Sequence, residues 1–108
     1  MGEATTSREE RYALVLPARC RTRSGFMHRI VITDLSPGGC RIEGDCLSMR
    51  VDDVVVISPG VIEGQCGRIV WIRGNLAGVV FDRKLYGPVV EHLARQHTNT
   101  LYITPDPL

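Results

Sequence analysis

The residues of this chain that could do chemistry concentrate in the stretch DLSPGG, from Asp34 to Gly39. Asp34 offers two acceptor oxygens and Ser36 both a donor and an acceptor, which suits recognition of a small polar ligand. If both residues lie at the end of one strand, their two-residue spacing directs the side chains to the same face. Gly39 permits a positive φ and a close approach of the backbone. The alternative is a tight turn in which Asp34 or Ser36 bonds to local backbone amides.

Two arginines, Arg8 and Arg11, precede this stretch in a polar segment without hydrophobic periodicity. A guanidinium presents a planar fork of donors that pairs with phosphate or carboxylate oxygens. Arginines on a loose leading segment therefore suit closure over an anion. The alternative is a solvated charged segment, because Glu9 and Glu10 lie between the two arginines and offset their charge.

Charge and composition narrow the classes of function. The net charge of +1 gives no indication of a DNA, RNA or membrane-surface partner. The length of 108 residues fits one small domain, and 44% hydrophobic residues with only 6% aromatic ones predict an aliphatic core. No apolar run approaches the roughly 18 residues of a membrane span. We therefore expect no membrane insertion and a cytoplasmic location.

Neither a metal site nor a catalytic centre is indicated. The cysteines form no Cys-x-x-Cys pair and the histidines lie far apart in sequence, so we expect no metal and no cofactor. No histidine lies near a nucleophile and no Gly-x-x-x-x-Gly-Lys loop is present, so we expect no enzyme activity. Cys20, Cys40 and Cys66 are expected to fill the core as small hydrophobic residues.

Short alternating segments separated by glycine turns predict an antiparallel barrel or sandwich. The predicted strands cover about residues 14–23, 27–35, 40–44, 52–58, 63–73 and 76–82. In the fifth, Gly64 and Gly67 indicate bulges or a sharp bend. The outward face of the first strand carries a basic stripe of Arg19, Arg21 and Arg23. This stripe could attract an anionic dinucleotide or an acidic surface of a partner, although a solvated strand face is the commoner explanation.

From Leu85 the hydrophobic period becomes that of a helix. Leu85, Val89 and Leu93 recur at every fourth position, and Pro88 is tolerated in the first turn. We expect the apolar face of this helix to plug or flank the barrel. The predicted organisation is a flexible segment 1–10 carrying the arginines, a barrel with its helix over 11–97, and a tail 98–108.

Together, DLSPGG, the leading arginines and the order of six strands and one helix resemble the PilZ domain, a small barrel known as a receptor for cyclic di-GMP. The resemblance covers roughly residues 8–96. It implies an all-β fold, a six-stranded antiparallel PilZ-type β-barrel with a C-terminal α-helix. It also implies that Asp34, Ser36 and Gly39 contact cyclic di-GMP on the outer barrel surface. Trp71, in RIVWIRGNLAGVVF, is implied to lie against a guanine, with packing in the barrel as the alternative.

The leading arginines depart from the family pattern by one residue. The family has Arg-x-x-x-Arg, whereas here REER places two residues between Arg8 and Arg11. Arg11 falls where the second family arginine belongs, and the first would fall on Ser7. In an extended chain an offset of three directs two side chains to opposite faces, whereas a helical turn makes them neighbours. Arg11 therefore takes the position of the second family arginine, whereas Arg8 lies one residue away from the position of the first.

By resemblance, the chain is a single-domain cyclic di-GMP receptor or adaptor that signals through an unidentified effector protein, in bacterial motility or biofilm control. The alternative is a divergent PilZ protein that does not bind cyclic di-GMP and acts by protein contact, for example in pilus assembly or motility. Generic DNA or RNA binding by a small barrel is disfavoured by the near-zero net charge and the few aromatic residues.

Overall fold

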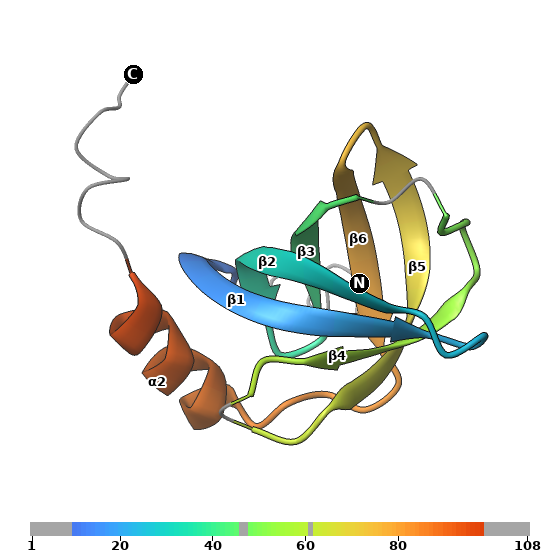
Figure 1. Cartoon of the computed structure of the whole chain (residues 1–108). Helices are drawn as coiled ribbons and strands as arrows, with labels where there is room; N and C mark the ends of the chain where they lie inside the picture. The colour runs from blue at the N-terminus through green and yellow to red at the C-terminus, as the bar shows by residue number, and fades with distance from the viewer. Residues whose placement is uncertain (1–9, 46–47, 61, 99–108) are drawn as a thin grey trace, which may run out of the picture.

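The chain folds into a closed antiparallel β-barrel with one helix beside it (Figure 1). The computed structural model describes residues 10–45, 48–60 and 62–98. The strands are β1 (Tyr12–Thr22), β2 (Met27–Ser36), β3 (Gly39–Gly44), β4 (Val54–Ser58), β5 (Gln65–Arg73) and β6 (Leu76–Phe81). They follow one another around the barrel in the order β1-β2-β3-β6-β5-β4, and the pairing of β1 with β4 closes it. The predicted six-stranded barrel is confirmed.

Alternation of apolar and polar residues explains why these segments become strands of a barrel. In β1, Leu14, Leu16, Ala18 and Cys20 are buried and the residues between them face outward. Inward residues from the other strands complete the core, including Ile32, Ile42, Ile57 and Ile69. Each buried aliphatic side chain of this size contributes about 1.5–3 kcal/mol relative to exposure. The expected aliphatic core is therefore the one that forms.

Two glycines confirm two of the predicted turns. Gly25 has a φ of 94° in the β1–β2 turn, and Gly60 has a φ of 91° after β4. A residue with a side chain adopts such angles only at a cost, so glycine fixes where these strands end. The fifth strand is shorter than predicted, because it begins at Gln65 and leaves Gly64 outside. Its register shift lies between Ile69 and Trp71 rather than at a glycine.

The prediction for one cysteine is wrong. Cys20 and Cys40 are buried as expected, but Cys66 is exposed. In β5 the residues facing the core are Gly67 and Ile69, so alternation directs Cys66 outward. Hydrophobicity of the residue type alone does not reveal this, since the face of a strand is set by its register.

The helix α2 (Gly87–His97) flanks the barrel on the side of β1 and β2 (Figure 1). Val90 and Leu93 are buried in the same core as the strands, and Pro88 occupies the first turn as predicted. The helix begins two residues later than predicted, because Tyr86 has an extended backbone with a ψ of 128°. Before it, the amide of Leu85 donates to the carbonyl of Pro37 at 2.8 Å. This bond ties the chain before α2 to the β2–β3 turn.

In the described part of the chain, no helix has both the length and the hydropathy that a membrane span requires. The predicted tail, apart from Thr98, lies outside the described residues.

Candidate functional site

The β2–β3 turn carries the DLSPGG residues on a rigid support. Ser36 pairs with Gly39 across the turn, so only Pro37 and Gly38 connect the two strands. The carbonyl of Gly38 accepts a bond from the amide of Phe81 at 2.8 Å, in addition to the bond from Leu85 to Pro37. The turn is therefore fixed by backbone bonds from the end of β6 and from the segment before α2.

Ser36 and Gly39 have largely structural roles in this turn. The hydroxyl of Ser36 donates to the carbonyl of Gly39 at 3.3 Å, and Ser36 is only 8% exposed. Ser36 therefore makes a local bond within the turn, to a carbonyl rather than to the backbone amide that the alternative interpretation named. Gly39 does not have a positive φ, and that expectation is wrong. Glycine is required here by close approach instead, because a Cβ would overlap the backbone carbonyl of Val79 on β6.

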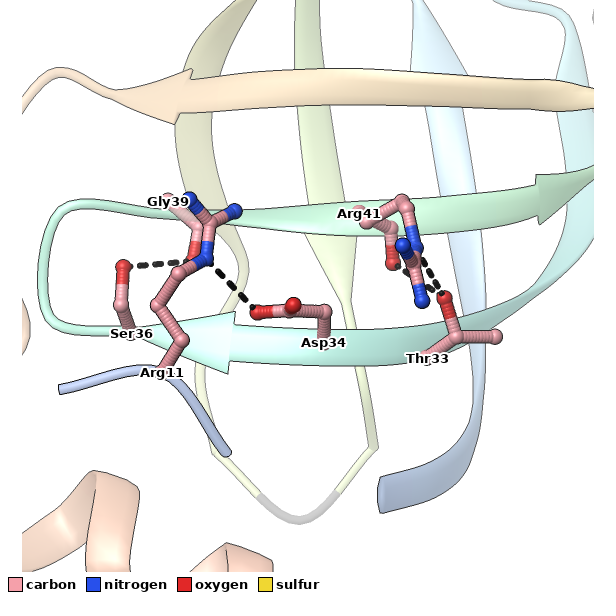
Figure 2. Close-up of polar contacts among 6 residues, drawn as sticks. All are labelled: Arg11, Thr33, Asp34, Ser36, Gly39 and Arg41. Carbon is pink, nitrogen blue, oxygen red and sulfur yellow. Dashed lines mark hydrogen bonds and ion pairs between the residues drawn. The ribbon is translucent and has the colours of Figure 1, made fainter. Parts of the chain in front are cut away.

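Arg11 reaches the carboxylate of Asp34, as Figure 2 shows. Its Nε donates to Oδ1 of Asp34 at 3.2 Å. The arginine side chain remains 62% exposed, whereas that of Asp34 is 21% exposed. Such an exposed ion pair is worth about 0.2–1 kcal/mol, so it positions Arg11 without locking it in place. Arg8 lies outside the described residues.

Arg41 lies beside Asp34, a position that sequence reasoning missed. It pairs with Asp34 on β2 and with Gly78 on β6, and Gly78 in turn pairs with Trp71 on β5. These residues form one row across four strands. The Nε of Arg41 donates to the hydroxyl of Thr33 at 3.0 Å (Figure 2). A signal was present in the sequence, because a two-residue turn at Pro37 and Gly38 places Arg41 opposite Asp34 by counting.

The indole ring of Trp71 packs against Gly78. A Cβ on Gly78 would overlap the indole ring, so the ring can pack at this position only because residue 78 has no side chain. Arg73 lies on the same side, as alternation predicts, with its guanidinium carbon 5.5 Å from the Trp71 ring centroid. At this distance a cation–π interaction with Arg73 helps to hold the partly exposed indole at the barrel surface.

A groove of about 440 Å³ brings most of these residues together. We call it the motif groove; it is lined by residues 11, 36, 38–40, 70–71, 78–81 and 84. Arg11, Ser36, Gly39 and Trp71 all line it, and Asp34 adjoins it through its ion pair with Arg11. Every predicted site residue in the described part of the chain therefore lies in or beside one groove on the outer barrel surface.

The family comparison agrees with this geometry. The family model for the PilZ domain matches residues 5–96. The chain belongs to the PilZ domain family. PilZ domains are binding or adaptor domains of bacteria, of the type that receives cyclic di-GMP. Comparison with curated proteins found no matching relative.

The chemistry available in the motif groove of this PilZ domain is that of binding. Arg11 and Lys84 supply positive charge, Trp71 supplies an aromatic face, and the carboxylate of Asp34 accepts hydrogen bonds. In the described residues, no group of three or more His, Cys, Asp or Glu side chains could hold a metal ion. An anionic ligand with a planar, donor-bearing ring matches this set of groups.

The residue after Arg11 is directed to other partners. The hydroxyl of Tyr12 donates to the Glu10 carboxylate at 2.5 Å, and this bond raises the pKa of Tyr12 to about 12. The charges of Glu91 and Arg95 on α2 also act on Tyr12. Arg11, just before β1, therefore lies in the motif groove, whereas Tyr12, the first residue of β1, interacts with charges on α2.

Proposed function

We propose that this PilZ domain binds cyclic di-GMP in the motif groove and signals through a partner protein in the bacterial cytoplasm. The observation that carries the proposal is the convergence of Arg11, Ser36, Gly39 and Trp71 on one groove beside Asp34. These residues come from three separate parts of the sequence. A volume of about 440 Å³ is within the range of about 300–1,000 Å³ that small-ligand sites occupy.

Each group has a complementary part of the ligand. The N1–H and exocyclic amine of a guanine are donors, and the Asp34 carboxylate accepts from both. The indole of Trp71 offers a face on which a guanine can stack. Arg11 supplies a guanidinium for a phosphate or for the O6 and N7 edge of a base. Arg41, next to Asp34 in the same row, is placed to add a second guanidinium.

Binding requires an exchange of partners at Arg11. In the absence of ligand, Arg11 neutralises Asp34. The ligand would give Asp34 two new donors and Arg11 a new anion. Each charge-assisted bond to the ligand is worth about 1.5–3 kcal/mol. The exposed ion pair that must open is worth about 0.2–1 kcal/mol, so the exchange is favourable. We expect an affinity from submicromolar to low micromolar.

The alternative is a divergent PilZ protein that acts by protein contact alone. The spacing of Arg8 and Arg11, one residue short of the family pattern, favours it. So does the ion pair between Arg11 and Asp34, because a pair of this kind can also be a stable end state. Under this alternative the motif groove stays empty of nucleotide.

Calorimetry with cyclic di-GMP distinguishes the two functions. We expect heat of binding with the intact protein and none with cyclic di-AMP, since adenine lacks the N1–H and amine pair that Asp34 accepts. If the wild-type protein gives no heat of binding with cyclic di-GMP, the proposal is contradicted. In that case the variant Ser7→Arg, which restores the family spacing, decides the cause. Binding by the variant alone would show that the barrel is competent and that only the arginine spacing has diverged.

A further inference from the structure

A second groove, of about 710 Å³, lies on the outer surface of the barrel away from the motif groove. We call it the arginine groove; it is lined by residues 17–19, 29–31, 43–44 and 58–60. Its lining residues belong to β1, β2, the end of β3, the end of β4 and the turn that follows β4. It shares no residue with the motif groove.

Two arginines lie side by side in the arginine groove. Arg19 on β1 pairs directly with Arg29 on β2, and both are exposed. Like charges directly opposite each other in an antiparallel pair reduce stability. Within residues 10–45, 48–60 and 62–98, neither arginine forms an ion pair with a carboxylate. On its other side, Arg19 pairs with Ser58 of β4, which is uncharged. The protein thus keeps an unfavourable charge pair that an anion placed between the two guanidinium groups would relieve.

The rest of the groove is largely apolar. Pro17, Val31 and Pro59 line it, and the acid that lines it is Glu43 on β3. Glu43 pairs with Val31, so β2 separates it from Arg19. One carboxylate at this end would repel the closely spaced phosphates of a nucleic acid. A segment with one acidic side chain beside apolar ones satisfies both the arginines and the apolar wall.

The groove presents the guanidinium groups of Arg19 and Arg29, together with apolar side chains, to an occupant. An occupant that satisfies these groups binds through its own side chains. We infer that the arginine groove docks an acidic and apolar segment of a partner protein, with its carboxylate held between Arg19 and Arg29. This inference concerns a surface distinct from the nucleotide site and does not depend on cyclic di-GMP binding.

The test uses an N-acetylated, C-amidated peptide with one aspartate and a leucine at the second position to either side, so that the three side chains share one face of an extended segment. Binding is followed by amide NMR of the full chain. We expect it to shift the amides of residues 18–19, 29–31, 43–44 and 58, which line the groove. The matching peptide with asparagine for aspartate should bind at least about tenfold more weakly, because it loses the charge-assisted bonds. The double variant Arg19→Gln/Arg29→Gln should lose the same factor, whereas Arg83→Gln, an exposed arginine outside the groove, should not.

Three outcomes would overturn the inference. The peptide leaves these amides unmoved, or the asparagine peptide binds equally well, or a single-stranded oligonucleotide of equal charge displaces the peptide from the groove.

A second measurement is independent of any ligand. Arg29→Gln should raise the thermal midpoint of unfolding, because it removes the like-charge pair. A lower midpoint would show that Arg29 has a structural partner, which contradicts the argument. Cyclic di-GMP binding should be unchanged in the double variant, so failure here is separable from failure at the motif groove.

Discussion

The substitution Arg11→Ala tests the proposed exchange at the motif groove most directly. The side chain of Arg11 is 62% exposed and, within the described residues, its ion pair is with Asp34. Its removal costs the bond or bonds to the ligand, each worth about 1.5–3 kcal/mol. In the variant no ion pair has to be broken when the ligand binds, which returns about 0.2–1 kcal/mol to the binding free energy. For one bond the net loss is about 0.5–3 kcal/mol, which raises the Kd for cyclic di-GMP about 2- to 150-fold.

The same substitution should barely change folding. Because the pair is exposed, its loss should lower the free energy of unfolding by less than about 1 kcal/mol. Urea denaturation followed by circular dichroism measures this, and isothermal titration calorimetry measures the Kd. The matched control is Arg95→Ala. Arg95 is 73% exposed and pairs with Glu91 at 3.9 Å on α2, outside the motif groove. It should leave the Kd unchanged.

A Kd within a factor of two of the wild-type value in Arg11→Ala would refute the reasoning, since Arg11 would then contribute nothing beyond its pair with Asp34. An equal loss of affinity in Arg95→Ala would also refute it. In that case general loss of positive charge, rather than position beside Asp34, would explain the effect.

Three further predictions follow from buried or closely packed residues. Gly39→Ala should lower the free energy of unfolding by about 1–3 kcal/mol in urea, because its Cβ overlaps the Val79 carbonyl. Gly78→Ala should displace the Trp71 indole, shift its fluorescence emission and weaken cyclic di-GMP binding. Burial, followed by the charges of Cys20 and Asp34, raises the pKa of the Cys40 thiol. A thiol reagent applied to Cys46→Ser protein should therefore modify exposed Cys66 quickly and Cys40 only on unfolding.

The last prediction has a definite pH dependence. The folded state holds the Cys40 proton more tightly than the unfolded chain, whose cysteines ionise near pH 8.5. The stabilising contribution is thus complete below that pH and is lost as the pH rises above it, so alkaline solution favours unfolding. Cys40→Ala should reduce this dependence. Rapid modification of Cys40 in the folded protein would contradict the prediction. For the glycines, wild-type stability in Gly39→Ala or unchanged emission in Gly78→Ala would contradict the close contacts.

Much of the architecture was predictable from local patterns. The alternation in β1 identified its buried face, and the positive φ of Gly25 and Gly60 confirmed two predicted turns. The turn at Pro37 and Gly38 was also predictable from the sequence. Counting back along both strands from this turn places Arg41 opposite Asp34, a pairing that the sequence analysis did not include. Period, turn chemistry and spacing along a strand depend on neighbouring residues, so the sequence determines them directly.

The assembly of the site depended on pairings between distant strands. Trp71 reaches the row of Asp34 and Arg41 because β6 pairs with both β3 and β5. The requirement for glycine at position 39 comes from the Val79 carbonyl on β6, and the exposure of Cys66 from the register of β5. The sequence by itself determined the strands, the turns and the family motif. Only the tertiary structure decided which side chains meet, because the closed barrel fixes one register for all its strands at once.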